Sequence, residues 1–377
     1  MVIKNGFVFG AEGNFTKKDV YIDGERITDD KNDDDIINVE DCYVIPGLID
    51  VHFHGCVGHD FCDGSQESIS EMAKYELANG ITSMNPATMT LGESALLKIM
   101  EAAADYRKSN TGEGAELVGI NMEGPFISMA KKGAQNPDYI ARADAETFRR
   151  LQKASGGLIR LCALAPEEKG AMEFIDACKE EVVISVAHTT ADYDTAKEAF
   201  GRGAKQVTHL YNTMPPFSHR APGVIGAACD SDCNVELICD GVHVHPAVIR
   251  ATFKMFGDDR IILISDSMEA TGMPDGEYSL GGQAVKVQGN LATLADGTIA
   301  GSATNLMNCL RYAVKTAGIP LESAVKCATK NPSIAVGLSA DYGSIEAGKY
   351  ADIVILDRDL NLVHVIKKGK VCEGLIN

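Results

Sequence analysis

Short apolar runs alternate with amphipathic segments of helical length between residues 44 and 265, and this alternation most narrows the choice of fold. Such a pattern is typical of parallel strands joined by crossover helices. There are eight runs, at residues 44–51, 81–85, 117–122, 158–164, 182–187, 206–209, 235–239 and 261–265. Because eight parallel strands close a (β/α)8 barrel, the pattern predicts an α/β protein with a TIM-like barrel. An open doubly wound sheet would also fit the alternation, but its glycine-rich dinucleotide motif is absent.

The two ends of the chain differ from this middle part, because they consist of short strand-like runs separated by turn signals. Chain ends usually lie close together in a domain. We therefore predict that residues 1–46 and 344–377 form one small β domain, with the barrel of residues 47–343 inserted in it. The glycine-rich stretch 272–301 resembles an inserted hairpin before the last helices.

Net charge bears on the choice of partner. The chain has 35 Lys and Arg residues against 53 Asp and Glu residues, a formal charge of −18. This sign is opposite to that of proteins that bind nucleic acids or anionic membranes, so neither is expected as a partner. No apolar run approaches the roughly 18 residues that span a bilayer, and the first residues do not resemble a leader, so we expect a cytoplasmic location. An anionic ligand would need a local group of donors.

Metal-ligating and acidic side chains follow the predicted strands. In a barrel, functional residues gather at the carboxyl ends of the strands. The residues at or just beyond these ends are His52, His54, Glu123, His188, His209, His243 and Asp266. A single histidine there would most simply be a core residue, and Asp266 alone could cap a helix. Several histidines converging on one rim favour a metal site instead.

Glu123, His188 and His209 come from three different strands and offer one carboxylate and two imidazoles. This set matches catalytic zinc with one position left open for water, whose pKa the metal lowers toward about 7. His52 and His54 are two residues apart on a strand, so both side chains project to the same face. Asp266 is then placed to accept the proton of that water.

Several of these residues belong to longer motifs: PGLIDVHFHG at 46–55, EGPF at 123–126, THLYNTM at 208–214, DGVH at 240–243 and SD at 265–266. In this order they resemble the N-acetylglucosamine-6-phosphate deacetylases of the amidohydrolase superfamily, over essentially the whole chain. The first motif marks only the superfamily, whereas the later ones are specific to the deacetylases. The resemblance implies an amidohydrolase-type barrel with a small β-sandwich built from the N- and C-terminal segments.

The same resemblance implies an activity: metal-dependent hydrolysis of the acetamido group of N-acetyl-D-glucosamine 6-phosphate to D-glucosamine 6-phosphate and acetate, in amino sugar catabolism. It implies that Glu123, His188 and His209 hold a divalent metal, for which Zn²⁺ is expected, with Fe²⁺, Mn²⁺, Co²⁺ and Ni²⁺ as further candidates. His52 and His54 match the place where some members hold a second ion, so the sequence leaves one or two ions open.

For substrate and partners, the resemblance implies that Asp266 is the catalytic acid and base and that His243 binds the substrate and polarises the acetyl carbonyl. It implies that Asn212, Thr213 and Arg220 contact the sugar phosphate, with Arg220 crossing into the site of the second subunit of a homodimer. It further implies that Leu306 lines the acetyl pocket.

Two positions depart from the family pattern. Gln135 stands at a substrate-binding position where the family usually has histidine, and Thr213 stands where it has alanine. The sequence therefore leaves open whether N-acetylgalactosamine 6-phosphate is also accepted. Four further functions compete with deacetylation: a cyclic amidase or a nucleobase deaminase of the same superfamily, a metal-storage or metal-sensing protein, and a barrel scaffold without catalysis.

Overall fold

The computed structural model describes residues 1–31, 35–109 and 112–372, and its centre is a barrel of parallel strands. The strands are β8 (Leu48–Asp50), β11 (Ile81–Met84), β12 (Glu116–Leu117), β13 (Ile120–Glu123), β14 (Ile159–Leu164), β15 (Val183–Val186), β16 (Gln206–Val207), β17 (Asn234–Ile238) and β18 (Ile261–Ile264). They form two parallel sheets, β12-β11-β8 and β13-β14-β15-β16-β17-β18. The predicted TIM-like barrel is confirmed.

The first and last barrel strands meet through backbone hydrogen bonds beyond their ends. The amide of Asp266 donates to the carbonyl of His52 at 2.9 Å, and the amide of His54 donates to the carbonyl of Ser267 at 2.7 Å. Because all barrel strands are parallel, their carboxyl ends share one rim. The closure therefore brings residues from the two ends of the barrel sequence together there.

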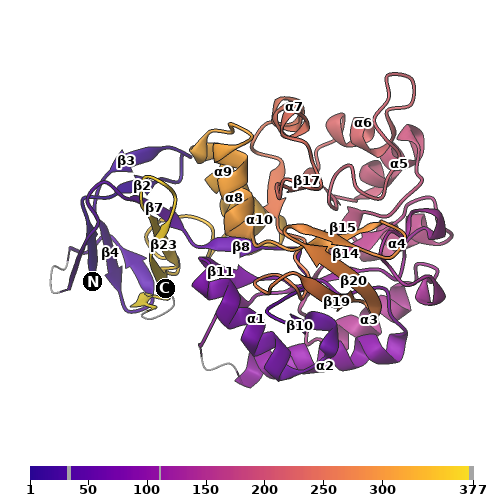
Figure 1. The fold of residues 1–377 in the computed structure, drawn as a ribbon, viewed down its shortest axis with the longest axis horizontal. Helices are drawn as coiled ribbons and strands as arrows, with labels where there is room; N and C mark the ends of the chain where they lie inside the picture. The colour runs from indigo at the N-terminus through magenta and orange to yellow at the C-terminus, as the bar shows by residue number, and fades with distance from the viewer. Residues whose placement is uncertain (32–34, 110–111, 373–377) are drawn as a thin grey trace.

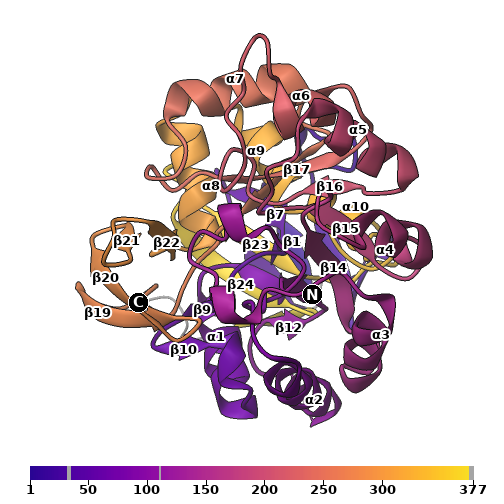
Figure 2. The same cartoon turned by 90° about the vertical axis from the view of Figure 1, so that its right-hand side faces the viewer.

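Helices surround the strands (Figure 2). They are α1 (Gln66–Ala78), α2 (Glu93–Ser109), α3 (Ala145–Ala154), α4 (Ala171–Cys178), α5 (Tyr193–Arg202), α6 (Gly223–Cys229), α7 (Pro246–Phe256), α8 (Leu306–Lys315), α9 (Leu321–Ala328) and α10 (Lys330–Ala335), with 3₁₀ turns η1 (Phe61–Asp63), η2 (Met129–Lys131) and η3 (Pro137–Tyr139). Side-chain caps begin several of them; Asp192, for example, accepts from the amide of Thr195 at the start of α5. Among the described helices, none is long and apolar enough to cross a membrane.

The terminal segments form two further sheets at one side of the barrel (Figure 1). One, in the order β5-β4-β1-β6, contains β1 (Val2–Lys4), β4 (Val20–Asp23), β5 (Arg26–Thr28) and β6 (Ile36–Asn38). The other, in the order β25-β24-β23-β7-β2-β3, contains β2 (Phe7–Phe9), β3 (Phe15–Lys17), β7 (Tyr43–Pro46), β23 (Ile353–Leu356), β24 (Leu362–Lys367) and β25 (Lys370–Val371). Ile3, Val44 and Ile353 are among the fully buried side chains of their common core.

The domain boundaries themselves stay a prediction, and residues 373–377 of the predicted small domain lie outside the described residues. The run 44–51, which we expected to be one strand, is two: β7 pairs within the terminal sheet and β8 within the barrel. Gly47 separates them, and a Cβ there would lie 2.1 Å from the hydroxyl oxygen of Thr82. The chain therefore passes from one sheet to the other where there is no room for a side chain.

The stretch 272–301 forms more than the expected hairpin. It contains four antiparallel strands in sequence order, β19 (Gly276–Leu280), β20 (Gln283–Gln288), β21 (Leu291–Thr293) and β22 (Ile299–Ser302). Buried Met89, Met268 and Leu280 pack this sheet against the rim of the barrel, where β9 (Gly55–Cys56) and β10 (His59–Asp60) also pair. The inserted sheet consequently contributes to the surroundings of the strand ends.

Ion pairs join the terminal sheet to the barrel. Lys367 at the end of β24 is 8% exposed, and its Nζ lies 2.5 Å from Asp352 Oδ2 and 3.7 Å from Glu116 Oε2 of barrel strand β12. Glu116 Oε2 also accepts from Tyr342 at 2.9 Å and lies 2.8 Å from Lys368 Nζ. Asp352 therefore provides the nearest counter-charge of a buried lysine.

We expect the substitution Asp352→Asn to lower the free energy of unfolding by about 3 kcal/mol, because it leaves the buried Lys367 ammonium without its nearest carboxylate. Urea unfolding followed by circular dichroism measures the change. In the double variant Asp352→Asn with Lys367→Met, much of the lost stability should return. Equal losses in the single and the double variant would contradict this role of the pair.

Candidate metal centre and active site

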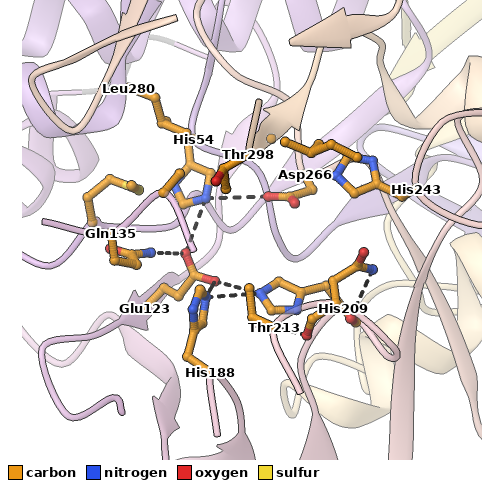
Figure 3. A pocket seen from close by; sticks show the side chains of 15 residues that line it. His54, Glu123, Gln135, His188, His209, Thr213, His243, Asp266, Leu280 and Thr298 are labelled. Atoms are coloured by element: carbon orange, nitrogen blue, oxygen red, sulfur yellow. Dashed lines mark hydrogen bonds and ion pairs between the residues drawn. The ribbon is translucent and has the colours of Figure 1, made fainter. Parts of the chain in front are cut away.

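Three side chains from separate strands meet at the barrel rim (Figure 3). Glu123 ends β13, His188 follows β15 and His209 follows β16. Glu123 Oε1 lies 3.1 Å from His188 Nε2 and 3.1 Å from His209 Nε2, and the two nitrogens are 3.1 Å apart. All three residues are at least 96% buried. The predicted ligand set is thus brought together as one compact triangle.

The triangle has the dimensions of a metal site. At zinc bond lengths of about 2.0–2.1 Å, the ligand atoms of a tetrahedron lie roughly 3.3 Å apart. The three donor atoms are 3.1 Å from one another, and the set contains one carboxylate and two imidazoles. His188 Nδ1 lies 3.0 Å from the carbonyl oxygen of Lys131, to which it can only donate, so the neutral ring has its lone pair on Nε2. The residues fit a divalent cation.

A second group of candidate ligands adjoins the first. It consists of His52, His54 and Asp266. Asp266 Oδ1 lies 3.6 Å from His52 Nε2 and 3.4 Å from His54 Nε2. Glu123 connects the two groups, since its Oε2 lies 3.3 Å from His54 Nε2 while its Oε1 faces the first group. A carboxylate in this position can serve both groups.

Three of the rim residues have left-handed backbone conformations. The φ angles are 44° at His188, 29° at His209 and 50° at Asp266. Non-glycine residues in this region are strained by about 1–3 kcal/mol and need surrounding support. Backbone hydrogen bonds supply this support: the amide of Ser128 donates to the carbonyl of His188 at 2.9 Å, and the amide of Ser302 donates to the carbonyl of Asp266 at 2.7 Å. The chain turns sharply at these points, directly after the strands.

The charges of the site offset the cost of burying its carboxylates. Burial raises the pKa of the Asp266 carboxyl, but the hydrogen bond with His54 and the charge of His52 outweigh burial and lower this pKa below its ordinary value. Burial likewise raises the pKa of Glu123, and the charge of His52 with the hydrogen bonds of His188 and His209 holds it well below its usual range. Both carboxylates are therefore ionised at neutral pH.

His243 is held by its own carboxylate. Its Nδ1 lies 2.7 Å from Asp240 Oδ2, and Asp240 Oδ1 accepts from the amides of Val242 and His243 at 2.9 Å. Burial lowers the pKa of the His243 imidazole, but the hydrogen bond and the charge of Asp240 outweigh burial and raise it. The other ring nitrogen is left for a ligand in the cavity that His243 lines.

The strand ends surround a cavity of about 230 Å³. Its lining contains most of the predicted site residues: His54, Glu123, Gln135, His188, His209, Asn212, Thr213, His243 and Asp266. Met89, Leu280, Thr298 and Ile299 also line it, and none of these was predicted from the sequence. The last three belong to the inserted sheet or its loop, so the cavity has a polar wall from the barrel and a mainly apolar wall from the insertion.

Comparison with known proteins agrees with this geometry. The model of the amidohydrolase family matches residues 43–372. The chain belongs to the amidohydrolase family. The resemblance to this superfamily, which the motifs indicated, is confirmed.

Individual relatives cover nearly the whole chain. An N-acetylglucosamine-6-phosphate deacetylase of Bacillus subtilis (strain 168) is 37% identical over 374 residues, 98% of this chain and 93% of the relative. An N-acetylgalactosamine-6-phosphate deacetylase of Escherichia coli O157:H7 is 33% identical over 330 residues, 87% of each chain. The solved structure of an aspartate-to-alanine variant of N-acetyl-D-glucosamine-6-phosphate deacetylase from Mycobacterium smegmatis, in complex with N-acetyl-D-glucosamine-6-phosphate, has a TM-score of 0.92 at 32% identity and covers 100% of this chain and 99% of that one.

Gln135, where this amidohydrolase departs from the family pattern, touches a candidate ligand. Its Nε2 donates to Glu123 Oε2 at 2.8 Å, and its Oε1 accepts from the amide of Thr90 at 2.6 Å. The side chain is 2% exposed and also lines the cavity. Gln135 is therefore placed to orient Glu123 as well as to contact a substrate.

Two predicted site residues lie away from the cavity. Arg220 is exposed, in the loop before α6, and lines a different groove with Pro215 and Tyr193. Leu306, the first residue of α8, is fully buried in the main hydrophobic core and does not line the cavity. A further buried carboxylate, Glu236 in β17, was not predicted, although it contacts His52. The available signal was a charged residue inside an apolar run.

We expect added Zn²⁺ to raise the melting temperature of chelator-treated protein, because a ligand present at 100 times its Kd stabilises the folded state by about 2.7 kcal/mol. Differential scanning fluorimetry measures the shift. The substitution His188→Asn should abolish most of it. His364→Asn, in β24 of the terminal sheet, serves as the matched control and should keep it. A full shift in the His188 variant would remove that residue from the site.

Proposed function

We propose that this protein hydrolyses the acetamido group of N-acetyl-D-glucosamine 6-phosphate, giving D-glucosamine 6-phosphate and acetate in amino sugar catabolism. The observation that carries the proposal is the convergence of Glu123, His188, His209, Asp266 and His243 on one cavity. Full-length relatives named for this deacetylation support the choice of substrate. A sugar phosphate does not cross membranes unaided, so the proposal includes a cytoplasmic location.

Glu123, His188 and His209 would hold the catalytic divalent cation, and His52, His54 and Asp266 would hold a second one. Imidazole and carboxylate ligands suit Zn²⁺, and Fe²⁺, Mn²⁺, Co²⁺ and Ni²⁺ accept the same donors. When bound, the cation supplies Lewis-acid chemistry, which makes a water nucleophilic at neutral pH and polarises a carbonyl.

Asp266 moves the protons of the reaction. Because its pKa is lowered, it is a carboxylate at neutral pH and can take a proton from a water in the cavity. The water oxygen bonds to the acetyl carbon, and the carbonyl oxygen takes the electron pair. Asp266 then returns the proton to the amide nitrogen as the carbon–nitrogen bond breaks. The products are acetate and the free amino sugar phosphate.

His243 would stabilise the negative charge that develops on the carbonyl oxygen. Asp240 accepts from Nδ1, so the other ring nitrogen, Nε2, faces the substrate. The raised pKa of His243 favours the form in which Nε2 carries a proton to donate. Figure 3 shows His243 beside Asp266, on the opposite side of the cavity from Gln135. The oxyanion and the proton shuttle would therefore be served by neighbouring side chains.

The phosphate needs cationic donors that the cavity itself lacks. Among the described residues that line it there is no lysine or arginine. Asn212 and Thr213 can donate hydrogen bonds, but neither carries charge. An exposed Arg220 reaching in from the second subunit of a homodimer would supply the missing charge. Because the chain has a net charge of −18, which repels an anionic substrate, a local cationic donor is needed to bind the phosphate.

N-acetylgalactosamine 6-phosphate is the second candidate substrate. A relative named as an N-acetylgalactosamine-6-phosphate deacetylase is 33% identical over 87% of this chain. Gln135, which can donate and accept hydrogen bonds but carries no charge, lines the cavity where the family pattern has histidine. Acetate release from both sugar phosphates, measured side by side with metal quantified in the same preparation, decides between them. Release from neither would contradict the proposed function.

We expect the substitution Asp266→Asn to lower kcat by about 10³-fold, because the amide can neither accept the proton of water nor return it to the leaving amine. An acetate-release assay measures the loss. The cation held by Glu123, His188 and His209 should remain, as metal analysis can verify. Turnover close to that of the unsubstituted protein would exclude Asp266 as the acid and base.

We expect the substitution Arg220→Met to raise KM for the phosphorylated sugar by roughly tenfold or more, since a charge-assisted hydrogen bond is lost. KM for N-acetylglucosamine without phosphate should change little. Arg202→Gln, at the exposed end of α5, is the control arginine and should leave both values unchanged. Equal effects of the Arg220 substitution on the two sugars would contradict a phosphate contact.

A further inference from the structure

Glu236 is a fully buried carboxylate in the middle of β17. Apolar side chains of the barrel interior, among them Ile49, Leu161 and Ile262, are buried near this strand, together with the polar Gln206. A buried carboxylate is costly unless hydrogen-bond donors surround it. Neither a helix end nor a surface explains this one, so its partners show what it does.

Glu236 accepts hydrogen bonds from three donors, two of which belong to candidate metal ligands. Its Oε2 lies 2.9 Å from His52 Nδ1 and accepts from the amide of His209 at 3.2 Å. Its Oε1 accepts from Gln206 Nε2 at 2.6 Å. His52 comes from the first strand of the barrel and His209 from the sixth. One carboxylate therefore connects both groups of candidate ligands.

The contact with Glu236 determines which nitrogen of His52 carries the proton. A carboxylate only accepts, so Nδ1 donates and the lone pair of the neutral ring lies on Nε2. His52 Nε2 is buried without a hydrogen-bond partner, 3.5 Å from Glu123 Oε1 and 3.6 Å from Asp266 Oδ1. Two carboxylates facing Nε2 favour a positive charge at this position, which a proton supplies in the metal-free protein and a cation supplies when one is bound.

His52 and His188 are held in different ways. His188 Nδ1 faces a neutral backbone carbonyl, that of Lys131. His52 Nδ1 faces a charged carboxylate, which makes the ring more basic and hence a stronger ligand. This difference fits a position where a second cation must be held close to a first one.

We propose that Glu236 is a positioning residue that fixes the Nδ1–H tautomer of His52 and directs Nε2 toward a second divalent cation held with His54 and Asp266. The proposal rests on the metal centre of the proposed function. It assigns Glu236 a role without contact to substrate, and it accounts for a negative charge in the barrel interior.

The substitution Glu236→Gln tests the charge with little change of shape. Its amide oxygen can replace Oε2 opposite His52 and His209, and Gln206 can turn its amide so that its buried, unpartnered Oε1 accepts from the new amide group. We expect the second Zn²⁺ equivalent to bind about 10- to 100-fold more weakly, while the first equivalent is unchanged. Titration against a competing chelator measures both constants.

The substitution Glu236→Met removes the acceptor, and we expect this variant to bind one Zn²⁺ per chain. In the Zn²⁺-loaded protein, ¹⁵N spectra of labelled histidine should show His52 with its proton on Nδ1 in the parent and in Glu236→Gln, and this signature should be lost in Glu236→Met. If the methionine variant does not fold, the titration of the glutamine variant decides alone. Glu116→Gln, which removes a carboxylate that pairs with Lys368 rather than with a candidate ligand, should keep both equivalents.

Two results would overturn the proposal: a parent protein that binds only one Zn²⁺ at saturation, or a Glu236→Gln variant whose second equivalent binds with unchanged affinity. Neither depends on turnover. Acetate release by the parent protein is measured separately, so a protein that binds two cations in this way and releases no acetate would contradict the proposed function and support the role of Glu236.

Discussion

The carboxylate of Glu123 is the interaction on which the rest of the site depends. Histidine nitrogens from four positions lie 3.1–3.5 Å from its two oxygens: His52, His54, His188 and His209. These imidazoles follow β8, β15 and β16, and the carboxylate ends β13. Because the ligands sit on strands far apart in the sequence, the group exists only when the barrel is closed. The same closure that forms the fold also forms the metal site.

Closure of the barrel does not by itself orient the ligand side chains. Left-handed backbone conformations and buried hydrogen-bonding side chains orient them. His188, His209 and Asp266 leave their strands in left-handed conformations that backbone hydrogen bonds stabilise. Glu236 then holds His52 from inside the barrel, and Gln135 holds Glu123 from the rim. Strained backbone and buried charge both cost free energy, and the hydrogen bonds and ion pairs of the site offset that cost. The same contacts hold the ligand side chains in one orientation.

The part of the site that follows from periodicity was predictable from the sequence. Once eight strands are counted, the residues after them must share a rim, and that rule alone identifies Glu123 and Asp266. The role of Glu236 was not predicted because this residue lies within a strand, and a single charged residue in an apolar run does not by itself indicate a functional position. The position of Leu280 at the cavity was not predicted, because the inserted sheet is placed there by its packing against the barrel rim. No local sequence pattern determines that packing. Leu306 was expected at the acetyl pocket on family resemblance alone, and the structure places it in the core.

The two walls of the cavity differ in origin and in polarity. The polar wall consists of barrel strand ends and the loops that follow them, and it carries the carboxylates and imidazoles of the proposed hydrolysis. The apolar wall comes largely from the insertion, through Leu280 and Ile299, and an insertion can change without disturbing the register of the barrel. Sugar preference would draw on both walls, since Gln135 belongs to the polar wall and Leu280 and Ile299 to the apolar one. A close match over the whole chain therefore defines the chemistry more firmly than the preference between two epimeric sugars, which differ at a single hydroxyl group.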